Sequence, residues 1–273
     1  MTETDPRVAR GAGSALPEEA EVAGLVGVLG GMGPLATIDF MRKMLQATPA
    51  ATDQEHVPVV VSSIPQVPDR TRAFHGDGAS PLHAMVASGR RLVAAGAGLV
   101  LIPCNTAHLW FDEIQLAIGL PMLHLVDAAL EEAIAVAGSA GRIGLMATDA
   151  TLASGLYVNR VPSDMPGRGV QWLLPTAREM LELVMPGIAA VKAGQLGAGA
   201  ELFNGAALAL KQRGASAVVL GCTEIPVVID AANSPLPVID ATAALARRAV
   251  AWSLAQRHPA AHSSQIVEHS ACR

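Results

Sequence analysis

The feature that most constrains this chain is a segment that occurs twice, an apolar run ending in a cysteine that small hydrogen-bonding residues follow. The first copy is Leu99–His108 and the second is Ala217–Pro226. An apolar run of four or five residues bounded by glycine predicts a parallel strand that is buried on both faces. Ligands bind beyond the carboxyl ends of such strands. The sequence therefore predicts that Cys104 and Cys222 occupy two equivalent ligand-facing positions.

The segments around the two cysteines follow one another in the same order in residues 25–127 and 142–240. Each stretch predicts a strand, a loop of small residues, a helix, a second strand, a helix, the cysteine strand, a helix and a strand that begins Leu-Pro. This order indicates an internal duplication. We therefore expect an α/β fold of two pseudo-symmetric domains, each a mostly parallel sheet flanked by helices, with the active site in the cleft between them.

The domain boundaries follow from this order and from the composition of the two ends. We expect a disordered leader at 1–21, an N-terminal α/β domain at 22–124 that is completed by 238–256, a C-terminal α/β domain at 125–237 and a flexible tail at 257–273. The two Leu-Pro strands are expected within 120–127 and 236–240. Two such halves would place Cys104 and Cys222 across one cleft.

Composition excludes several classes of protein. Hydrophobic residues make up 51% of the chain and aromatic residues only 3%, which is typical of alanine- and valine-rich helices packed on a parallel sheet. A net charge of −5 leaves no basic surface for nucleic acid. No apolar run reaches the 18 or so residues of a membrane helix, and no secretory signal is found. With three cysteines, an odd number, we expect a cytoplasmic protein without disulfides.

The chemistry of paired cysteines indicates what the cleft does. A cysteine at the start of a helix lies among free backbone N–H groups, which lower the pKa of its thiol, and Thr106 and Thr223 are suitable helix caps. One thiolate can remove a proton from a tetrahedral carbon while an opposed thiol returns a proton to the other face. This inverts a stereocentre with no cofactor and no metal, and no metal-ligand spacing is present among the cysteines and histidines.

Simpler interpretations apply to each of these residues when it is taken alone. A single free cysteine is more often part of a hydrophobic core than a catalyst, although two at equivalent places are harder to explain by packing. The segment Gly30–Gly33 lacks the spacing of a dinucleotide-binding loop. We expect His108 to be a satisfied polar residue, and Arg70 and Lys192, judged by composition alone, to be solvated surface charges.

Six short motifs are spread along the chain, at Gly30–Thr37, Asp53–His56, Pro68–Thr71, Pro103–His108, Lys192–Gly194 and Gly221–Pro226. Through these motifs the chain resembles the aspartate racemases of the aspartate/glutamate racemase superfamily, from about residue 22 to residue 253. In that family two pseudo-symmetric domains enclose the active site and catalysis does not use pyridoxal phosphate.

The resemblance implies a role for each matching residue. It makes Cys104 and Cys222 the catalytic acid and base, and it makes Arg70 and Lys192 the cations that bind a dicarboxylic amino acid. A second cation is what distinguishes such a substrate from alanine. The residues expected to hold the α-carboxylate and amino group, or to cover the substrate, are Asn105, Thr106, Thr223 and Met32.

The resemblance leaves the substrate partly open. Aspartate is the expected substrate, and glutamate, a broad set of amino acids or a related isomerisation such as that of maleate are the alternatives. A catalytically silent carboxylate-binding protein is a third and less favoured interpretation. Family members commonly form dimers, so a homodimer is expected.

Overall fold

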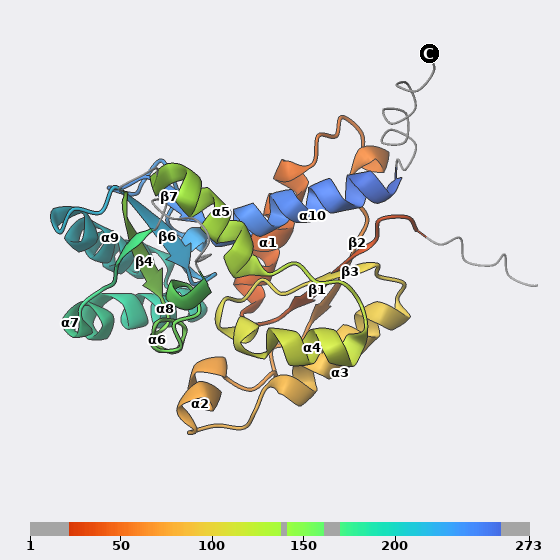
Figure 1. Cartoon of the computed structure of the whole chain (residues 1–273), viewed down its shortest axis with the longest axis horizontal. Helices are drawn as coiled ribbons and strands as arrows, with labels where there is room; N and C mark the ends of the chain where they lie inside the picture. Colours follow the sequence, from red (N-terminus) through yellow and green to blue (C-terminus); the bar gives the residue numbers. More distant parts are fainter. Residues whose placement is uncertain (1–21, 138–140, 161–169, 258–273) are drawn as a thin grey trace, which may run out of the picture.

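The computed structural model describes residues 22–137, 141–160 and 170–257 of the 273-residue chain. Within them the strands form two separate parallel sheets (Figure 1). The first sheet has the order β2-β1-β3 and the second has the order β5-β4-β6-β7. The strands are β1 (Val26–Gly30), β2 (Val59–Ser63), β3 (Leu99–Leu101), β4 (Arg142–Ala147), β5 (Gln171–Leu173), β6 (Ala217–Gly221) and β7 (Val238–Asp240).

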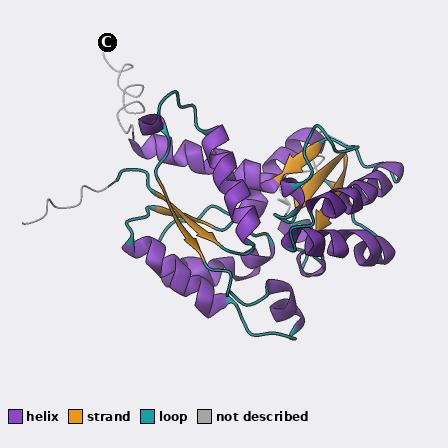
Figure 2. Ribbon diagram, turned by 180° about the vertical axis from the view of Figure 1, so that it is seen from behind, coloured by secondary structure: helices purple, strands orange, loops and turns teal. Residues whose placement is uncertain are grey.

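Helices cover both sheets (Figure 2), which confirms the expected α/β class. Residues 177–192 form one nearly continuous helical stretch in which a π-turn (Met180–Val184) separates two α-helices. The α-helices are α1 (Pro34–Ala47), α2 (Arg70–His75), α3 (Leu82–Ala94), α4 (Phe111–Ile118), α5 (Leu125–Ala137), α6 (Asp149–Ala153), α7 (Ala177–Glu179), α8 (Met185–Lys192), α9 (Leu196–Gln212) and α10 (Ala241–Arg257).

The two sheets repeat one design, as the internal duplication predicts. In each sheet the first strand along the chain lies at the centre, between the second and the third. Each central strand contains a glycine near its start, Gly27 in β1 and Gly144 in β4. A Cβ on Gly27 would lie 3.1 Å from the Cβ of Leu92 in α3, and one on Gly144 would lie 3.0 Å from Leu210 Cδ1 in α9. The glycines therefore allow equivalent helices to approach equivalent strands.

The main difference from the expected elements is that, among the described residues, the first sheet has three strands and lacks the expected fourth one. The segment 120–127 is wrong as a strand, because only Met122 makes a β-bridge, to Val100, and α5 already begins at Leu125. In the second sheet the equivalent strand, β7, is formed and pairs with β6. After Met122 the chain leaves the first sheet instead of extending along it. It then forms a helix against the second sheet and α10.

Helices α5 and α10 lie between the two sheets (Figure 1). Helix α10 packs on α1 and on α5, and α5 also contacts β4, β6 and β7. One hydrophobic core is therefore continuous from Val26 and Phe40 on one side to Ile143 and Val219 on the other, and each sheet has a second core on its outer face. We propose that residues 22–124 with 238–256 form one domain and residues 125–237 the other, and we call segments 22–124 and 125–237 the first and second halves.

A buried group of charges connects α1 to the start of α10. The ammonium of Lys43 lies 2.5 Å from Asp39 Oδ2 and 2.6 Å from Asp240 Oδ2, and it donates to Thr242 Oγ1 at 2.7 Å. Asp240 also accepts from the backbone N–H groups of Thr242 and Ala243, and thus caps α10. All three charges of this α1–α10 contact, those of Lys43, Asp39 and Asp240, are therefore paired, as burial of a charge requires.

Some sequence predictions concern the two ends of the chain. The leader 1–21, residues 258–273 with Cys272, and the segment 161–169 lie outside the described residues. Arg257, where the tail is expected to start, is the last residue of α10 and donates to the carbonyls of Glu55 and His56. In the described part of the chain, no helix combines the length and the apolar character that a membrane crossing needs.

Candidate active site

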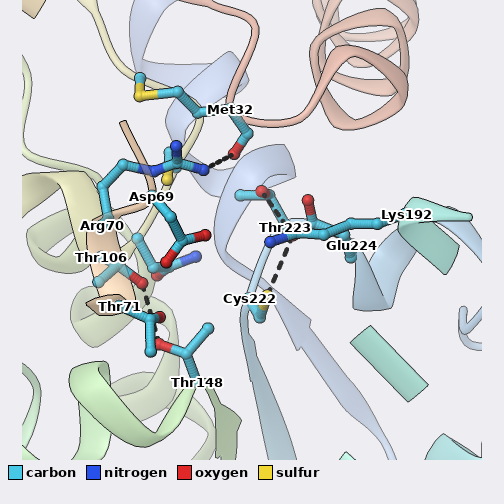
Figure 3. Close-up of a pocket in the computed structure, with 12 residues that line it drawn as sticks. Met32, Asp69, Arg70, Thr71, Thr106, Thr148, Lys192, Cys222, Thr223 and Glu224 are labelled. Atoms are coloured by element: carbon cyan, nitrogen blue, oxygen red, sulfur yellow. Dashed lines mark hydrogen bonds between the residues drawn. The ribbon is translucent and has the colours of Figure 1, made fainter. Parts of the chain in front are cut away.

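Loops at the carboxyl ends of strands from both sheets meet in one small cavity (Figure 3). Residues of the first half come from the loops after β1, β2 and β3, and those of the second half follow β4 and β6 or end α8. All eight site residues named from the sequence line the cavity, and four others join them. The lining residues are Met32, Asp69, Arg70, Thr71, Cys104, Asn105, Thr106, Thr148, Lys192, Cys222, Thr223 and Glu224.

Both cysteines are free and buried, with exposed fractions of 6% for Cys104 and 5% for Cys222. Cys222 directly follows β6, whereas Ile102 and Pro103 separate Cys104 from β3. The Cys104 N–H donates to the Ile102 carbonyl at 2.8 Å. This N–H is therefore already used and is not free to bind a substrate oxygen.

His108 supports the Cys104 loop from behind. One ring nitrogen, Nδ1, lies 2.8 Å from the Cys104 carbonyl, and the other, Nε2, accepts from the Leu125 N–H at 3.1 Å. Only an imidazole with its proton on Nδ1 satisfies both contacts. Burial lowers the pKa of His108 to about 4, so the ring is neutral near pH 7. His108 is thus a satisfied polar residue, as expected, and it ties the cysteine loop to the start of α5.

Cys222 has an acidic neighbour that the sequence interpretation missed. Its thiol donates to Glu224 Oε2 over an Sγ–O distance of 3.1 Å (Figure 3). Glu224 is only 4% exposed, and its other oxygen, Oε1, has no hydrogen-bond partner within the described ranges. Burial, and next the negative charge of Glu224, raise the pKa of the Cys222 thiol well above its usual range. In the empty cavity Cys222 is therefore held as a thiol.

The expected role of a helix start in lowering the pKa of a cysteine is not found at Cys222. A 3₁₀ turn follows each cysteine: Thr106–Trp110 after Cys104 leads directly into α4, whereas Ile225–Val227 after Cys222 is not continued by an α-helix. The capping positions before these turns belong to Asn105 and Glu224, so Thr106 and Thr223 are wrong as helix caps. The turn of three residues after Cys222 has a small dipole, which does not offset the burial of the Cys222 thiol.

Thr106 instead connects the two halves of the site. Its hydroxyl lies 2.9 Å from the hydroxyls of both Thr148 and Thr151. Thr148 in turn caps α6, because its side chain accepts from the backbone N–H of Thr151. A closed triangle of hydroxyls therefore fixes the loop after Cys104 against the loop after β4.

Arg70, the first residue of α2, points back towards the cavity. Its guanidinium donates to the carbonyls of Val67 at 3.2 Å and Pro68 at 3.0 Å, and it reaches the Met32 carbonyl at 3.5 Å (Figure 3). It is only 9% exposed, and its Nε has no hydrogen-bond partner in the part of the chain that the structure describes. The acceptors around it are neutral carbonyls, so the described contacts leave its charge available for an anion. Met32, 2% exposed, covers this side of the cavity.

The cavity adjoins a larger hollow that we call the vestibule. Two residues that line both spaces are Lys192, at the end of α8, and Asp69, the cap of α2. The cavity itself has a free volume of about 20 Å³, which is room for about one water molecule, whereas the vestibule measures about 500 Å³. The cavity must therefore widen before an amino acid can enter it. The vestibule is lined by Gly31, Gly33, Pro34, Leu35, Ala36, Pro65, Val67, Val191 and Gly194, with Asp69, Arg70, Lys192 and Glu224 shared.

The sequence was compared with models of protein families. Residues 29–249, most of the chain, match the model of the Asp/Glu/hydantoin racemase family. The chain belongs to this family. It is therefore a racemase by descent, as the six motifs predict, and its two-domain fold is that of solved racemases.

Individual relatives of this racemase agree with that assignment. It is 27% identical over 236 residues to the broad specificity amino-acid racemase RacX of Bacillus subtilis (strain 168), covering 85% of this chain and 99% of the relative. Picrophilus torridus aspartate racemase superimposes with a TM-score of 0.72 at 29% identity, over 83% of this chain and 94% of that one. Glutamate racemase from Francisella tularensis, at 16% identity and a TM-score of 0.61 over 86% and 81% of the chains, shares the fold.

Sequence reasoning missed the residues of this racemase that act through side-chain contacts formed only in the folded chain. Glu224 lies inside the second cysteine motif, but its contact with Cys222 depends on how the turn after β6 folds back. Thr148 follows the strand that repeats β1, and this equivalence to the glycine loop after β1 was the available signal. Tyr157, whose hydroxyl bonds to Asn105, carries no signal of its own in the sequence.

Proposed function

We propose that the protein interconverts the enantiomers of an acidic amino acid, aspartate first of all, without a cofactor, and that Cys104 and Cys222 are its acid and base. The observation that carries the proposal is that one cavity is lined by two free cysteines from equivalent loops and by two cations, Arg70 and Lys192. A cysteine pair explains inversion, and the cations explain why the substrate is a dicarboxylate.

The proposed reaction moves one proton at a time. The thiolate of one cysteine removes the α-proton and becomes a thiol, and the electron pair of the broken C–H bond is delocalised into the α-carboxylate. The other cysteine, as thiol, gives its proton to the opposite face of the carbon and becomes a thiolate. The product is the other enantiomer, and the two sulfurs have exchanged their protonation states. Loss of a proton from one thiol and uptake by the other through solvent restores the starting state.

The surroundings of the cysteines support unequal resting states. Cys222 donates to Glu224 and has a raised pKa, so it begins as the acid. The described hydrogen bonds give the Cys104 sulfur no carboxylate acceptor of this kind. With Cys222 as the acid, the two-thiol mechanism makes Cys104 the base in this direction of the reaction. The free enzyme is then prepared for the enantiomer whose α-proton faces Cys104, and the reverse reaction requires that a proton first leave Cys222.

The other lining residues would bind the substrate. Hydrogen-bond donors near the α-carboxylate must stabilise the charge that develops there in the transition state, and such donors are strongest in a cavity without water. Asn105, Thr106 and Thr223 are buried residues with exposed fractions of 5% or less. Asn105 supplies an amide donor and Thr223 a hydroxyl donor, whereas the hydroxyl of Thr106 holds its loop in place through Thr148 and Thr151. Arg70 and Lys192 would hold the side-chain carboxylate.

Incubation of the purified enzyme with each enantiomer of aspartate in deuterated water tests the proposal. With no pyridoxal phosphate added, chiral chromatography should show both enantiomers approaching an equal mixture, and mass spectrometry should show one deuterium at the α-carbon of the product. Absence of interconversion from both starting enantiomers would refute aspartate as the substrate.

A broader range of amino acids is the second candidate. It is favoured by the large vestibule next to the two cations and by the similarity to a racemase named for broad specificity. The same assay run on glutamate, methionine and alanine distinguishes the two candidates. A kcat/KM for aspartate at least tenfold above the others supports the acidic substrate, and comparable values support the broad range.

A further inference from the structure

The side-chain amide of Asn105 is buried at the wall of the cavity with only one of its two ends paired. Asn105 is 2% exposed, and its Oδ1 accepts from the Tyr157 hydroxyl over 2.5 Å. Its Nδ2 group has no partner among the described residues. We infer that Tyr157 is a positioning residue, which fixes the Asn105 amide so that its NH₂ group is presented to a carboxylate of the ligand. The carboxylate ligand rests on the proposed function.

The chemistry of Tyr157 determines which way the amide points. Tyr157 is completely buried, and burial raises the pKa of its hydroxyl, so the hydroxyl keeps its proton. A buried hydroxyl proton needs an acceptor, and the Asn105 carbonyl oxygen is the one that the structure provides. With the amide reversed, the NH₂ group would face the hydroxyl, the hydroxyl proton would lose this acceptor, and a carbonyl oxygen would face the incoming carboxylate.

The hydroxyl itself is held rigidly from the second half. The ring of Tyr157 packs edge-to-face on Trp172 of β5, with the ring centres 6.0 Å apart. Three residues further along, the Arg160 guanidinium donates to the Asp127 carboxylate of α5. Asn105 belongs to the first half, so this hydrogen bond crosses between the halves. The amide is therefore oriented only when the two halves are together.

The unpaired NH₂ group specifies the class of group that binds next to it. A buried N–H without an acceptor is unfavourable, and an anionic oxygen is the strongest acceptor that a ligand can offer. An ammonium group offers no lone pair. We therefore assign this wall of the cavity to a carboxylate of the substrate, and not to its amino group.

Calorimetric titration with succinate, a dicarboxylate that has no amino group and cannot be racemised, tests the presented donor. Tyr157→Phe removes only the hydroxyl, and it should weaken succinate binding about tenfold because the amide is then free to rotate. It should raise KM for aspartate by a similar factor and change kcat less. Trp172→Phe is the matched control for lost packing on the Tyr157 ring and should leave succinate affinity within twofold.

Replacement of Asn105 distinguishes the two amide orientations. Asn105→Asp puts a negative oxygen where the donor is inferred, so it should weaken succinate binding at least tenfold more than Asn105→Ala. If Asn105→Asp binds as well as Asn105→Ala or better, the donor assignment is wrong. In the Asn105→Ala background, Tyr157→Phe should change affinity less than twofold, since no amide is left to orient.

Thermal unfolding of the ligand-free variants tests the same hydrogen bond without any substrate. A hydroxyl that donates to Oδ1 can also donate to a carboxylate, so Tyr157→Phe should lower Tm in the Asn105→Asp background at least as much as in the wild type. It should have little effect in the Asn105→Ala background. If Tyr157→Phe no longer lowers Tm in the Asn105→Asp background, the inference about Tyr157 is overturned. This result does not depend on ligand binding. Failure of succinate and aspartate to bind would instead count against the proposed function.

Discussion

Cys104 and Cys222 occupy equivalent places in the two halves, but their neighbours differ. The thiol of Cys222 donates to a carboxylate, whereas His108 supports the carbonyl of Cys104 and stays neutral. The duplication that produced two similar loops has therefore not produced two similar thiols. The difference can be measured, because each direction of the reaction uses the two cysteines in opposite roles.

Serine replacement of each cysteine separates those roles. Cys104→Ser and Cys222→Ser should each lower racemisation at least about a thousandfold, since inversion needs both an acid and a base and a serine hydroxyl is a poor base. Each variant retains one thiol, which can remove the α-proton it faces and return deuterium to the same face. NMR in deuterated water should therefore show slow exchange of one enantiomer, and of opposite enantiomers in the two variants. Racemisation at the wild-type rate in either variant would contradict the two-thiol mechanism.

Removal of the Glu224 charge should change the pH dependence in a defined direction. The carboxylate raises the pKa of Cys222, so Glu224→Gln should lower that pKa. In the direction that uses Cys222 as the base, kcat/KM rises with pH, and this rise should move to lower pH. In the opposite direction Cys222 must be a thiol, so the fall in kcat/KM at high pH should also move to lower pH.

The control for this variant is Glu113→Gln, on the exposed side of α4, which should leave both pH profiles unchanged. If Glu224→Gln lowers activity equally at all pH values, Glu224 has a purely structural role. A shift of both profiles to higher pH would contradict the resting states proposed for the two cysteines.

Among individual residues, the sequence was sufficient to predict the candidate catalytic and binding residues that lie within recognisable motifs. Cys104 and Cys222 follow from the duplication, and Arg70 and Lys192 follow from the resemblance, and all four line the cavity. Glu224 and Tyr157 were not predicted, because each acts through a side-chain contact that forms only when a turn folds back or the two halves meet. Motif spacing along the chain carries no information on such contacts.

The elements themselves were predicted where an apolar run is buried in its own sheet. The strands that contain Val28 and Val219 are examples. The segment 120–127 was not predicted correctly. Its Leu-Pro start repeats the Leu-Pro pair just before β7, but its last residues begin a helix that packs against the other half. The same apolar pattern fits a strand edge or a helix start, and only the partner surface decides between them.

The contact between α1 and α10 supports a stability prediction. Lys43→Met removes the cation between Asp39 and Asp240, and it leaves the buried Asp39, paired among the described residues only with the exposed Arg42, beside the partly buried Asp240. We expect the free energy of unfolding to fall by about 3 kcal/mol, measured by urea denaturation. Lys211→Met, on the exposed end of α9, is the matched control and should change stability by less than about 0.5 kcal/mol. Equal stability of the two variants would show that the buried charges do not hold α1 to α10.

The whole molecule encloses its site almost completely. The cavity with both cysteines has room for about one water molecule, and the vestibule beside it shares Arg70, Lys192 and two acids with it. Helix α1 forms one wall of the vestibule and belongs to the first half, whereas α8 forms another and belongs to the second. Relative movement of the halves would thus widen both spaces, and the vestibule is the side on which we expect the substrate to enter.

Narrowing the vestibule tests this path. Leu35→Trp adds a large ring at its wall on α1, where Leu35 is 37% exposed. We expect kcat/KM for aspartate to fall about tenfold, equivalent to about 1.4 kcal/mol, with a larger fall for the longer side chain of glutamate. Leu45→Trp, on the same helix and 55% exposed but outside the vestibule lining, is the control. Unchanged kinetics for Leu35→Trp would place the entrance elsewhere.

The packing of α10 on α1 has a consequence for synthesis of the chain. Helix α1 leaves the ribosome early, whereas α10, which covers it, ends about 200 residues later. At about 5–20 residues per second, translation of the intervening chain takes about 10 to 40 s. During this interval the α1 face that later receives α10 has no cover from its own polypeptide. The nascent chain therefore depends on chaperones, or on delayed folding, until its last helix emerges.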